Sequence, residues 1–163
     1  MDEVSRRANL AVGTFYQHYR SKRQLLLALM DDLLEKLAAI EFRAQAPADI
    51  RGMIYAMLAG AFAHDLHYLG AYRAWQEAVL TDARLARKQR QIHVWTTART
   101  EGVFERLRGL PGARRGVDVA GLAQAMDSFF WSLLGQAGRM SKVELERSIQ
   151  SATHLIYHAL FED

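Results

Sequence analysis

The chain has 163 residues, half of them hydrophobic, and it contains no cysteine, which excludes disulfide bridges and thiolate chemistry. No apolar stretch is long enough to cross a bilayer and nothing resembles a secretory leader, so we expect a cytoplasmic protein with no membrane span. Only two prolines interrupt a composition rich in Ala, Leu and Arg, which favours an all-α fold.

The net charge of +3 is concentrated at the start of the sequence. Residues 1–24 carry two acidic side chains and five basic ones, whereas the sixteen basic and sixteen acidic residues that follow cancel. The five basic residues are Arg6, Arg7, Arg20, Lys22 and Arg23. This distribution predicts a small anion-binding module joined to a neutral body.

Two short helices separated by a tight turn are expected first. The first helix ends near Asn9, a residue that tolerates the left-handed conformation of tight turns. The second follows at about residues 12–19, where Phe15 and Tyr19 share an inward face at i,i+4 spacing. Helix, turn and helix in this order predict a helix-turn-helix arrangement.

Longer helices are expected in the rest of the chain. Ser21 and Gln24 form a capping box for a third helix, whose leucines continue to about Phe42. Residues that typically start a helix follow at Pro47, Asp82, Asp118 and Ser141, the last forming a second capping box with Glu144. We therefore expect helices at about residues 47–67, 69–80, 82–107, 118–138 and 141–161, with a loop at RGLPGARRG.

The second short helix has the side chains that DNA recognition requires. A helix in the major groove needs outward groups that hydrogen-bond to base edges and phosphates, and Thr14, Gln17 and His18 supply them. Gly13 allows the backbone to approach the duplex closely, and Lys22 is placed to neutralise a phosphate. The sequence therefore predicts a partner of double-stranded DNA.

The segment RRANLAVGTFYQHYRSKRQLLLAL resembles the TetR family of bacterial transcriptional regulators. The resemblance covers about the first 40 residues and combines the turn, the Gly-Thr-aromatic-Tyr run, Ser-Lys and a leucine-rich helix in a fixed order. It implies DNA contacts, chiefly to the backbone, by Thr14, Tyr16, His18 and Lys22. It also implies that Ala11, Val12, Gly13 and Gln17 lie near the bases.

Two features depart from the family pattern. Asn9 replaces the usual turn glycine, and the helix that precedes MDEVSRRAN in the family is missing from the sequence. We expect Met1 to be an ordinary residue inside the second helix of the family fold. The resulting division is a partial DNA-binding domain with its connecting helix at residues 1–42, followed by an effector-binding and dimerisation domain at residues 43–163.

The resemblance implies that the larger domain binds a small effector and forms a homodimer through its last two helices. Apolar residues on these two helices exceed what one core contact needs, which agrees with a dimer. The expected dimer contacts are Leu122, Met126, Phe129, Leu133, Ile149 and Ile156. No cofactor is expected, and the predicted function is a ligand-responsive regulator, released from its operator by a hydrophobic or aromatic small molecule.

Aromatic residues of the larger domain form either an effector pocket or plain core. The expected pocket residues are Phe62, Tyr72, Trp75, Trp95 and Trp131, with His93, Thr97 and Asp127 as polar anchors. Asp127 lies on the apolar side of its helix, where a carboxylate either meets a partner such as arginine or anchors a polar or cationic ligand.

A helical metal-binding protein or enzyme is the alternative. His64 with His67, and His154 with His158, have spacings that place two metal ligands on one helical face, but neither pair has an obvious third ligand. No set of nucleophile, base and orienting group is present, so we expect no enzyme and no metal site. The basic run Arg84, Arg87, Lys88 and Arg90 is interpreted as solvated surface, because it lies far along the chain from the DNA-reading helix.

Overall fold

The structure is a computed structural model and describes residues 16–39, 49–66 and 69–161. Every regular element in these ranges is an α-helix, as expected, and residues 16–18 are the described end of the helix that precedes α3. The helices are α3 (Lys22–Ala39), α4 (Ile50–Leu66), α5 (Leu69–Val79), α6 (Ala83–Arg108), α7 (Val119–Ala137) and α8 (Lys142–Leu160). None of the helices described is both long and apolar enough to span a membrane.

The helix starts follow the capping residues that the sequence indicates. The Asp82 carboxylate accepts hydrogen bonds from the amides of Arg84 and Leu85 and begins α6, and Asp118 caps α7 in the same way. Ser141 and Glu144 form the expected reciprocal capping box at the start of α8. These bonds satisfy amide groups that a helix leaves without partners at its first turn.

The start of α4 differs from the prediction. The helix begins at Ile50, and the Asp49 carboxylate accepts a hydrogen bond of 2.7 Å from the Gly52 amide. Asp49 is therefore the capping residue, because its carboxylate satisfies an amide of the first turn, which a proline at position 47 cannot do. Pro47 itself, and the expected end of the third helix at Phe42, lie outside the described residues.

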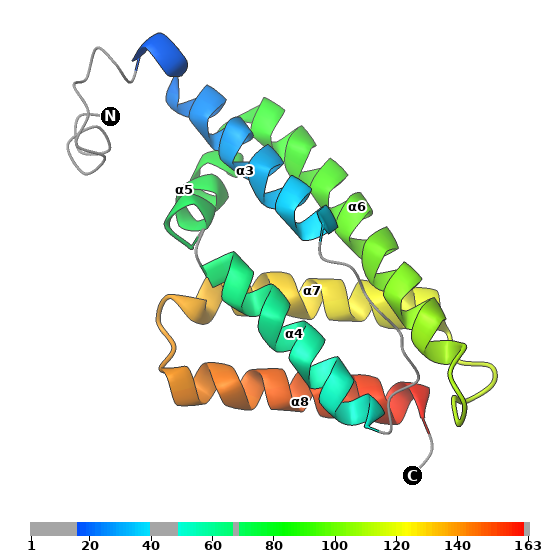
Figure 1. Cartoon of the computed structure of the whole chain (residues 1–163). Helices are drawn as coiled ribbons and strands as arrows, with labels where there is room; N and C mark the ends of the chain where they lie inside the picture. The colour runs from blue at the N-terminus through cyan, green and yellow to red at the C-terminus, as the bar shows by residue number, and fades with distance from the viewer. Residues whose placement is uncertain (1–15, 40–48, 67–68, 162–163) are drawn as a thin grey trace.

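The helices form two connected groups (Figure 1). In one group α7 and α8 run antiparallel side by side and α4 crosses them, with α4 packed mainly on α8. In the other, α3 runs alongside α6, and α5 packs against both. The long helix α6 also packs along α7, so it joins the two groups.

Residues expected to form the dimer contact lie inside the hydrophobic core of the single chain. Met126 and Leu133 on α7, and Ile149 and Ile156 on α8, are buried in the cluster beneath α4 and α6. A side chain enclosed by its own chain offers no surface to a partner, so the assignment of these four residues is wrong. Leu122 and Phe129 are only partly buried against this core, and their role stays a prediction.

Three polar contacts hold α3 against α6. Arg23 at the start of α3 forms an ion pair with Asp82, and Asp31 pairs with Lys88 at 2.7 Å. Near the end of α3, the Arg99 guanidinium donates a hydrogen bond of 2.7 Å to the carbonyl of Leu37. The contacts follow the same order along both helices, so α3 and α6 run parallel and are joined over most of the length of α3.

Candidate DNA-contacting segment and effector cavity

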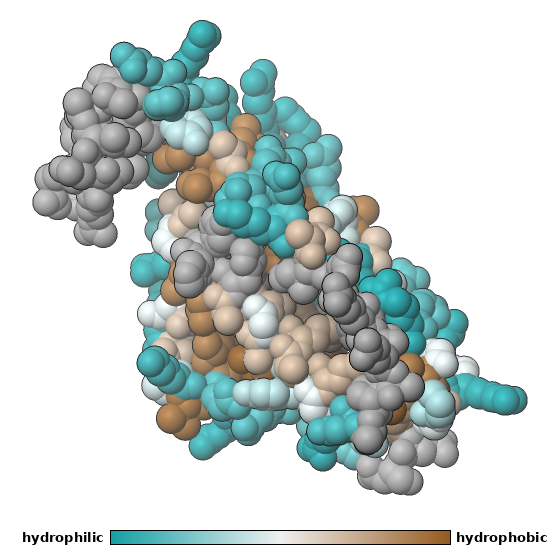
Figure 2. Space-filling model, in the orientation of Figure 1, coloured by the Kyte–Doolittle hydropathy of each residue, from teal (hydrophilic) through white to brown (hydrophobic). Residues whose placement is uncertain are grey.

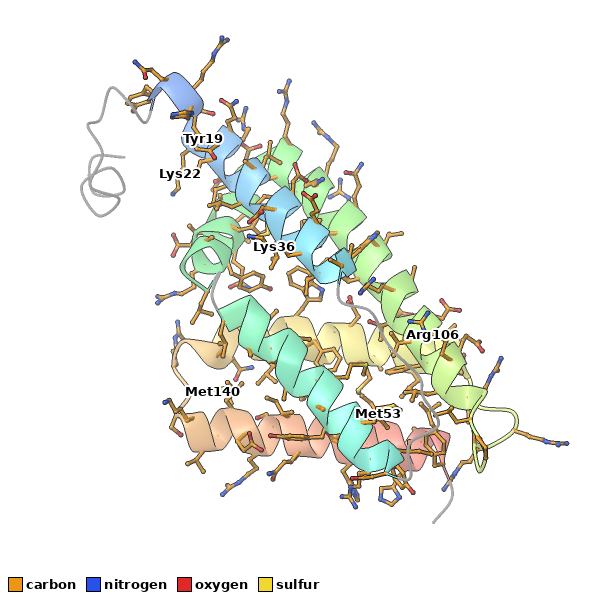
Figure 3. The ribbon with its side chains drawn as sticks, viewed as in Figure 1. Tyr19, Lys22, Lys36, Met53, Arg106 and Met140 are labelled. Atoms are coloured by element: carbon orange, nitrogen blue, oxygen red, sulfur yellow. The ribbon has the colours of Figure 1, made fainter. Side chains whose placement is uncertain are left out.

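The segment predicted to contact DNA, of which residues 16–22 are described, lies where α3 begins, at one end of the molecule (Figure 1). We call these residues the DNA-contacting segment. Tyr19 and Lys22 lie together there, at the opposite end of the view from Met53 on α4 (Figure 3). Tyr16 is 48% exposed, and Gln17, His18 and Lys22 are exposed too, so these four predicted contact residues present their side chains to solvent. The other four, Ala11, Val12, Gly13 and Thr14, lie outside the described residues.

Hydrogen bonds at the start of α3 fix the orientation of this segment. The Ser21 hydroxyl accepts a hydrogen bond from the Gln24 amide at 3.1 Å, as a capping residue does. The Gln24 side chain accepts from the amide of Arg20 at 2.7 Å, one residue before the position that a regular capping box uses. Hydrophilic surface predominates at this end of the molecule (Figure 2).

A cavity of about 420 Å³ lies between α3, α4, α5, α6 and α7. Its lining is mostly apolar, and it falls in the part of the molecule where apolar surface gathers between α3 and α4 (Figure 2). Four residues of α3 form one wall: Met30, Leu33, Leu34 and Leu37. A mostly apolar cavity of this size with a few polar groups is typical of a small-molecule site.

Polar groups enter the cavity wall from α6 and α7. Asp127 on α7 is only 6% exposed, and its carboxylate lies 3.3 Å from Nδ1 of His93. Arg99 on α6 lies over the ring of Trp95, with its guanidinium carbon 5.6 Å from the ring centre. Burial, and then repulsion from Arg106, lowers the pKa of Arg99 below its ordinary value. Among the described residues, the cavity wall therefore contains one acidic and one basic side chain.

Comparison with known protein families bears on the DNA-contacting segment. Residues 1–29 match the family model described as bacterial regulatory proteins, tetR family. This part of the chain is therefore similar to the tetR-family regulators. The match includes residues 16–21, which precede α3, and the first residues of α3, and it indicates a DNA-binding transcriptional regulator. No curated protein matches the chain as a relative.

Five of the residues predicted to bind the effector line the cavity of the regulator. They are Phe62, Tyr72, Trp95, Asp127 and Trp131, and they come from four different helices. The ring centres of Tyr72 and Trp131 lie 5.4 Å apart, and those of Phe62 and Phe130 lie 5.7 Å apart in an edge-to-face arrangement. Their role in binding an effector stays a prediction, but the structure brings them together.

Three of the predicted ligand residues do not line the cavity. Trp75 is fully buried in the core between α3, α5 and α6, where its Nε1 donates a hydrogen bond to Gln89. His93 contacts Asp127 without lining the cavity itself. Thr96 lines the cavity, whereas its neighbour Thr97 does not. One step along a helix turns a side chain by about 100°, which is enough to move it to another face.

Sequence reasoning missed Arg99 and the α3 wall as parts of the cavity. The leucine pattern of α3 was interpreted only as packing, because an apolar face has the same spacing whether it meets a core or a cavity. Arg99 lies four residues after Trp95, and this spacing places the two side chains on one face of α6. That spacing was a signal for the arginine.

His154 and His158 do not form a metal site with other residues that the structure describes. No group of three His, Cys, Asp or Glu side chains that could hold a metal ion occurs there. The rings of His154 and His158 are 4.2 Å apart, but the Arg51 guanidinium lies 3.2 Å from Nδ1 of His154 and occupies that nitrogen. His67 and the side chain of His64 lie outside the described part of the chain.

The basic run on α6 lies closer to the DNA-contacting segment than its sequence position suggested. The ion pair between Arg23 and Asp82 brings the start of α6 beside the start of α3. The long distance along the chain between this run and the DNA-reading helix is therefore no measure of its distance in space from the start of α3. Lys88 is engaged with Asp31, whereas Arg84, Arg87 and Arg90 are exposed, and their role as plain surface stays a prediction.

Proposed function

We propose that this regulator is a ligand-responsive repressor, released from its operator by a hydrophobic or aromatic small molecule that binds in the cavity. The observation that carries the proposal is that α3 adjoins both the DNA-contacting segment and the cavity. This helix follows the DNA-contacting segment directly, and four of its residues also form a wall of the cavity. A ligand in the cavity touches the helix on which the DNA-contacting segment is mounted.

The proposed mechanism is a shift between two conformations of α3. A ligand changes such an equilibrium only if it binds one conformation better than the other. Filling the cavity favours the conformation in which the α3 wall stands at the distance that the ligand requires. Operator affinity falls if this conformation places the DNA-contacting segments of the two protomers at the wrong spacing for successive major grooves.

The homodimer that this mechanism requires is proposed to form through the outward faces of α7 and α8. Two large apolar side chains of α8 are exposed on the single chain, Val143 at 68% and Leu155 at 52%. Small or polar residues of α7 are exposed as well, among them Ala125, Ser128 and Ser132. Small residues allow the helices of two protomers to approach closely. As a repressor that acts on DNA, the protein is proposed to work in the cytoplasm.

One experiment tests the repressor proposal. The chain is used to select duplexes from a random-sequence pool, and thermal unfolding then identifies compounds that stabilise the protein. We expect compounds that bind in the cavity to release the selected duplex. Met57→Trp, which fills the cavity from α4, should mimic the ligand or block its binding, while the exposed change Gln91→Trp on α6 is the control. Stabilising compounds that leave DNA affinity unchanged would refute the proposal.

A further inference from the structure

A buried carboxylate in the cavity wall has room for another hydrogen bond. Asp127 is 94% buried because only 6% of its surface is exposed, and it lines the cavity. Among the described residues, His93 is the one partner of the carboxylate, at 3.3 Å from Oδ2. Burying a carboxylate costs free energy unless hydrogen bonds or a positive charge compensate it. With this one long hydrogen bond, Oδ1 of Asp127 has no partner among the residues that the structure describes.

A chain of hydrogen bonds determines which proton His93 offers to Asp127. The Trp75 indole can only donate, so Gln89 Oε1 is the acceptor of that bond and Gln89 Nε2 is directed toward His93. The Gln89 amide therefore donates to Nε2 of His93, at 2.8 Å. Nδ1 then carries the proton and donates to the carboxylate. A His93 in this tautomer carries no charge, so it orients Asp127 without neutralising its charge.

The basic residue of the cavity does not neutralise Asp127 either. Arg99 donates to the Leu37 carbonyl at 2.7 Å and lies over the Trp95 ring, so its charge is engaged at the α3 end of the wall. No ion pair between Arg99 and Asp127 occurs in the described part of the molecule. The open position in the cavity is therefore the one beside the acidic group.

Several aromatic rings line the same cavity as Asp127. The Trp131 ring lies 4.6 Å from the His93 ring and 5.4 Å from the Tyr72 ring, measured between centres. Phe62 and Phe130 also belong to the lining, with ring centres 5.7 Å apart. The faces of such rings attract cations, and the attraction grows when water is excluded. A carboxylate among aromatic rings is a suitable site for an organic cation.

We propose that the effector is a hydrophobic amine, bound as its cation, whose N–H groups donate to Asp127 while its apolar part fills the aromatic end of the cavity. The proposal rests on the proposed function only in assuming that the cavity is the effector site. His93, Gln89 and Trp75 are positioning residues, because they act through the carboxylate. The ligand class follows from Asp127 and the surrounding rings.

The test compares three probes of similar size and different charge by isothermal titration calorimetry at neutral pH. Dibenzylamine is protonated, dibenzyl ether has the same shape without charge, and diphenylacetate is an anion. A charge-assisted hydrogen bond should make dibenzylamine bind about 10- to 100-fold more tightly than the ether. Diphenylacetate should bind least. Equal affinities for the amine and the ether, or tightest binding of the anion, would overturn the proposal.

A variant then assigns the preference to Asp127. Asp127→Asn keeps the shape and removes the charge, so it should weaken dibenzylamine about tenfold or more and change the ether less than about threefold. Ether binding shows that the cavity is intact in the variant. Glu77→Gln removes an exposed carboxylate from α5 and should leave both affinities unchanged. An amine preference that survives Asp127→Asn contradicts the proposal even if the wild-type preference is observed.

Failure of this proposal can be told apart from failure of the proposed function. If dibenzylamine binds through Asp127 but does not release the selected duplex, the ligand class is correct and the regulatory role of the cavity is wrong. If neutral or anionic compounds bind in the cavity and release the duplex, the regulatory role is correct and the ligand class is wrong. Calorimetry on the protein alone and DNA release are measured separately for this reason.

Discussion

Two neighbouring cations at the start of α3 should contribute differently to DNA affinity. Lys22 and Arg23 are both exposed, but the Arg23 guanidinium already forms an ion pair with Asp82. Among the described residues Lys22 has no ion-pair partner. A cation without a partner in the free protein neutralises a DNA phosphate and releases counterions, whereas Arg23 must first leave Asp82. We expect Lys22→Ala to flatten the salt dependence of binding more than Arg23→Ala does.

The size of the effect follows from the number of phosphates contacted. Each one contributes about 0.9 to the slope of log affinity against log salt concentration. In a complex of two protomers, Lys22→Ala should lower this slope by about 1.8, and Arg23→Ala by less than half of that. When the salt concentration rises from about 50 to 200 mM, the fold-loss of DNA affinity should therefore be about twelve times larger for the wild-type protein than for Lys22→Ala.

Fluorescence anisotropy with the selected duplex and a scrambled duplex, at several salt concentrations, measures these slopes. Lys22→Ala should weaken both duplexes alike and leave the preferred sequence unchanged, because a phosphate contact carries no base information. If the two variants lower the salt dependence of binding equally, the ion pair with Asp82 does not prevent Arg23 from contacting a phosphate. An unchanged slope in Lys22→Ala would show that Lys22 does not face a phosphate.

Three further predictions test other parts of the molecule. Gln17→Ala should cost about 1–3 kcal/mol per contact on the selected duplex and little on the scrambled one, measured by anisotropy, and equal losses would mean that Gln17 holds the backbone. Leu155→Glu should give monomers in sedimentation while the protomer stays folded. The core change Ile156→Ala is the comparison and should lower the free energy of unfolding by about 2–5 kcal/mol. A dimer that persists in Leu155→Glu would contradict the proposed interface. Hydrogen bonds from the Ser141 backbone and hydroxyl lower the pKa of Glu144 below its ordinary 4.5. The stability from this capping box is therefore complete above pH 4.5 and is lost as the pH falls through the lowered pKa. The free energy of unfolding, measured with denaturant at several pH values, should show this loss in the wild-type protein and not in Glu144→Gln.

The parts of the fold that depend on neighbouring residues could be predicted from the sequence. Asp82, Asp118 and Ser141 begin helices because their side chains accept hydrogen bonds from amides two or three residues later, and this chemistry needs no distant partner. The loop at RGLPGARRG is confirmed too, with positive φ at Gly112 and Gly116. Local hydrogen bonding and backbone freedom are sufficient for these elements.

The parts that depend on distant partners could not be predicted in the same way. Helical spacing shows that Ile149 and Ile156 share an apolar face, but the same spacing serves a core contact and a dimer contact. Trp75 and Trp131 are both aromatic residues of amphipathic helices, and only the packing of α5 against α3 and α6 places Trp75 in the core. The partner of Asp127 is likewise 34 positions away in the sequence.

The three contacts between α3 and α6 allow the two helices to tilt as one rigid unit. At a rise of 1.5 Å per residue, the twelve residues from Lys22 to the cavity-lining Leu34 span about 18 Å. A tilt of about six degrees at the cavity would then carry the DNA-contacting end sideways by about 2 Å, more than half the length of a hydrogen bond. Under the proposed mechanism the three contacts keep α6 beside α3, so a bound molecule need not bend either helix. A small tilt of α3 at the cavity therefore becomes a larger sideways movement at its DNA-contacting end.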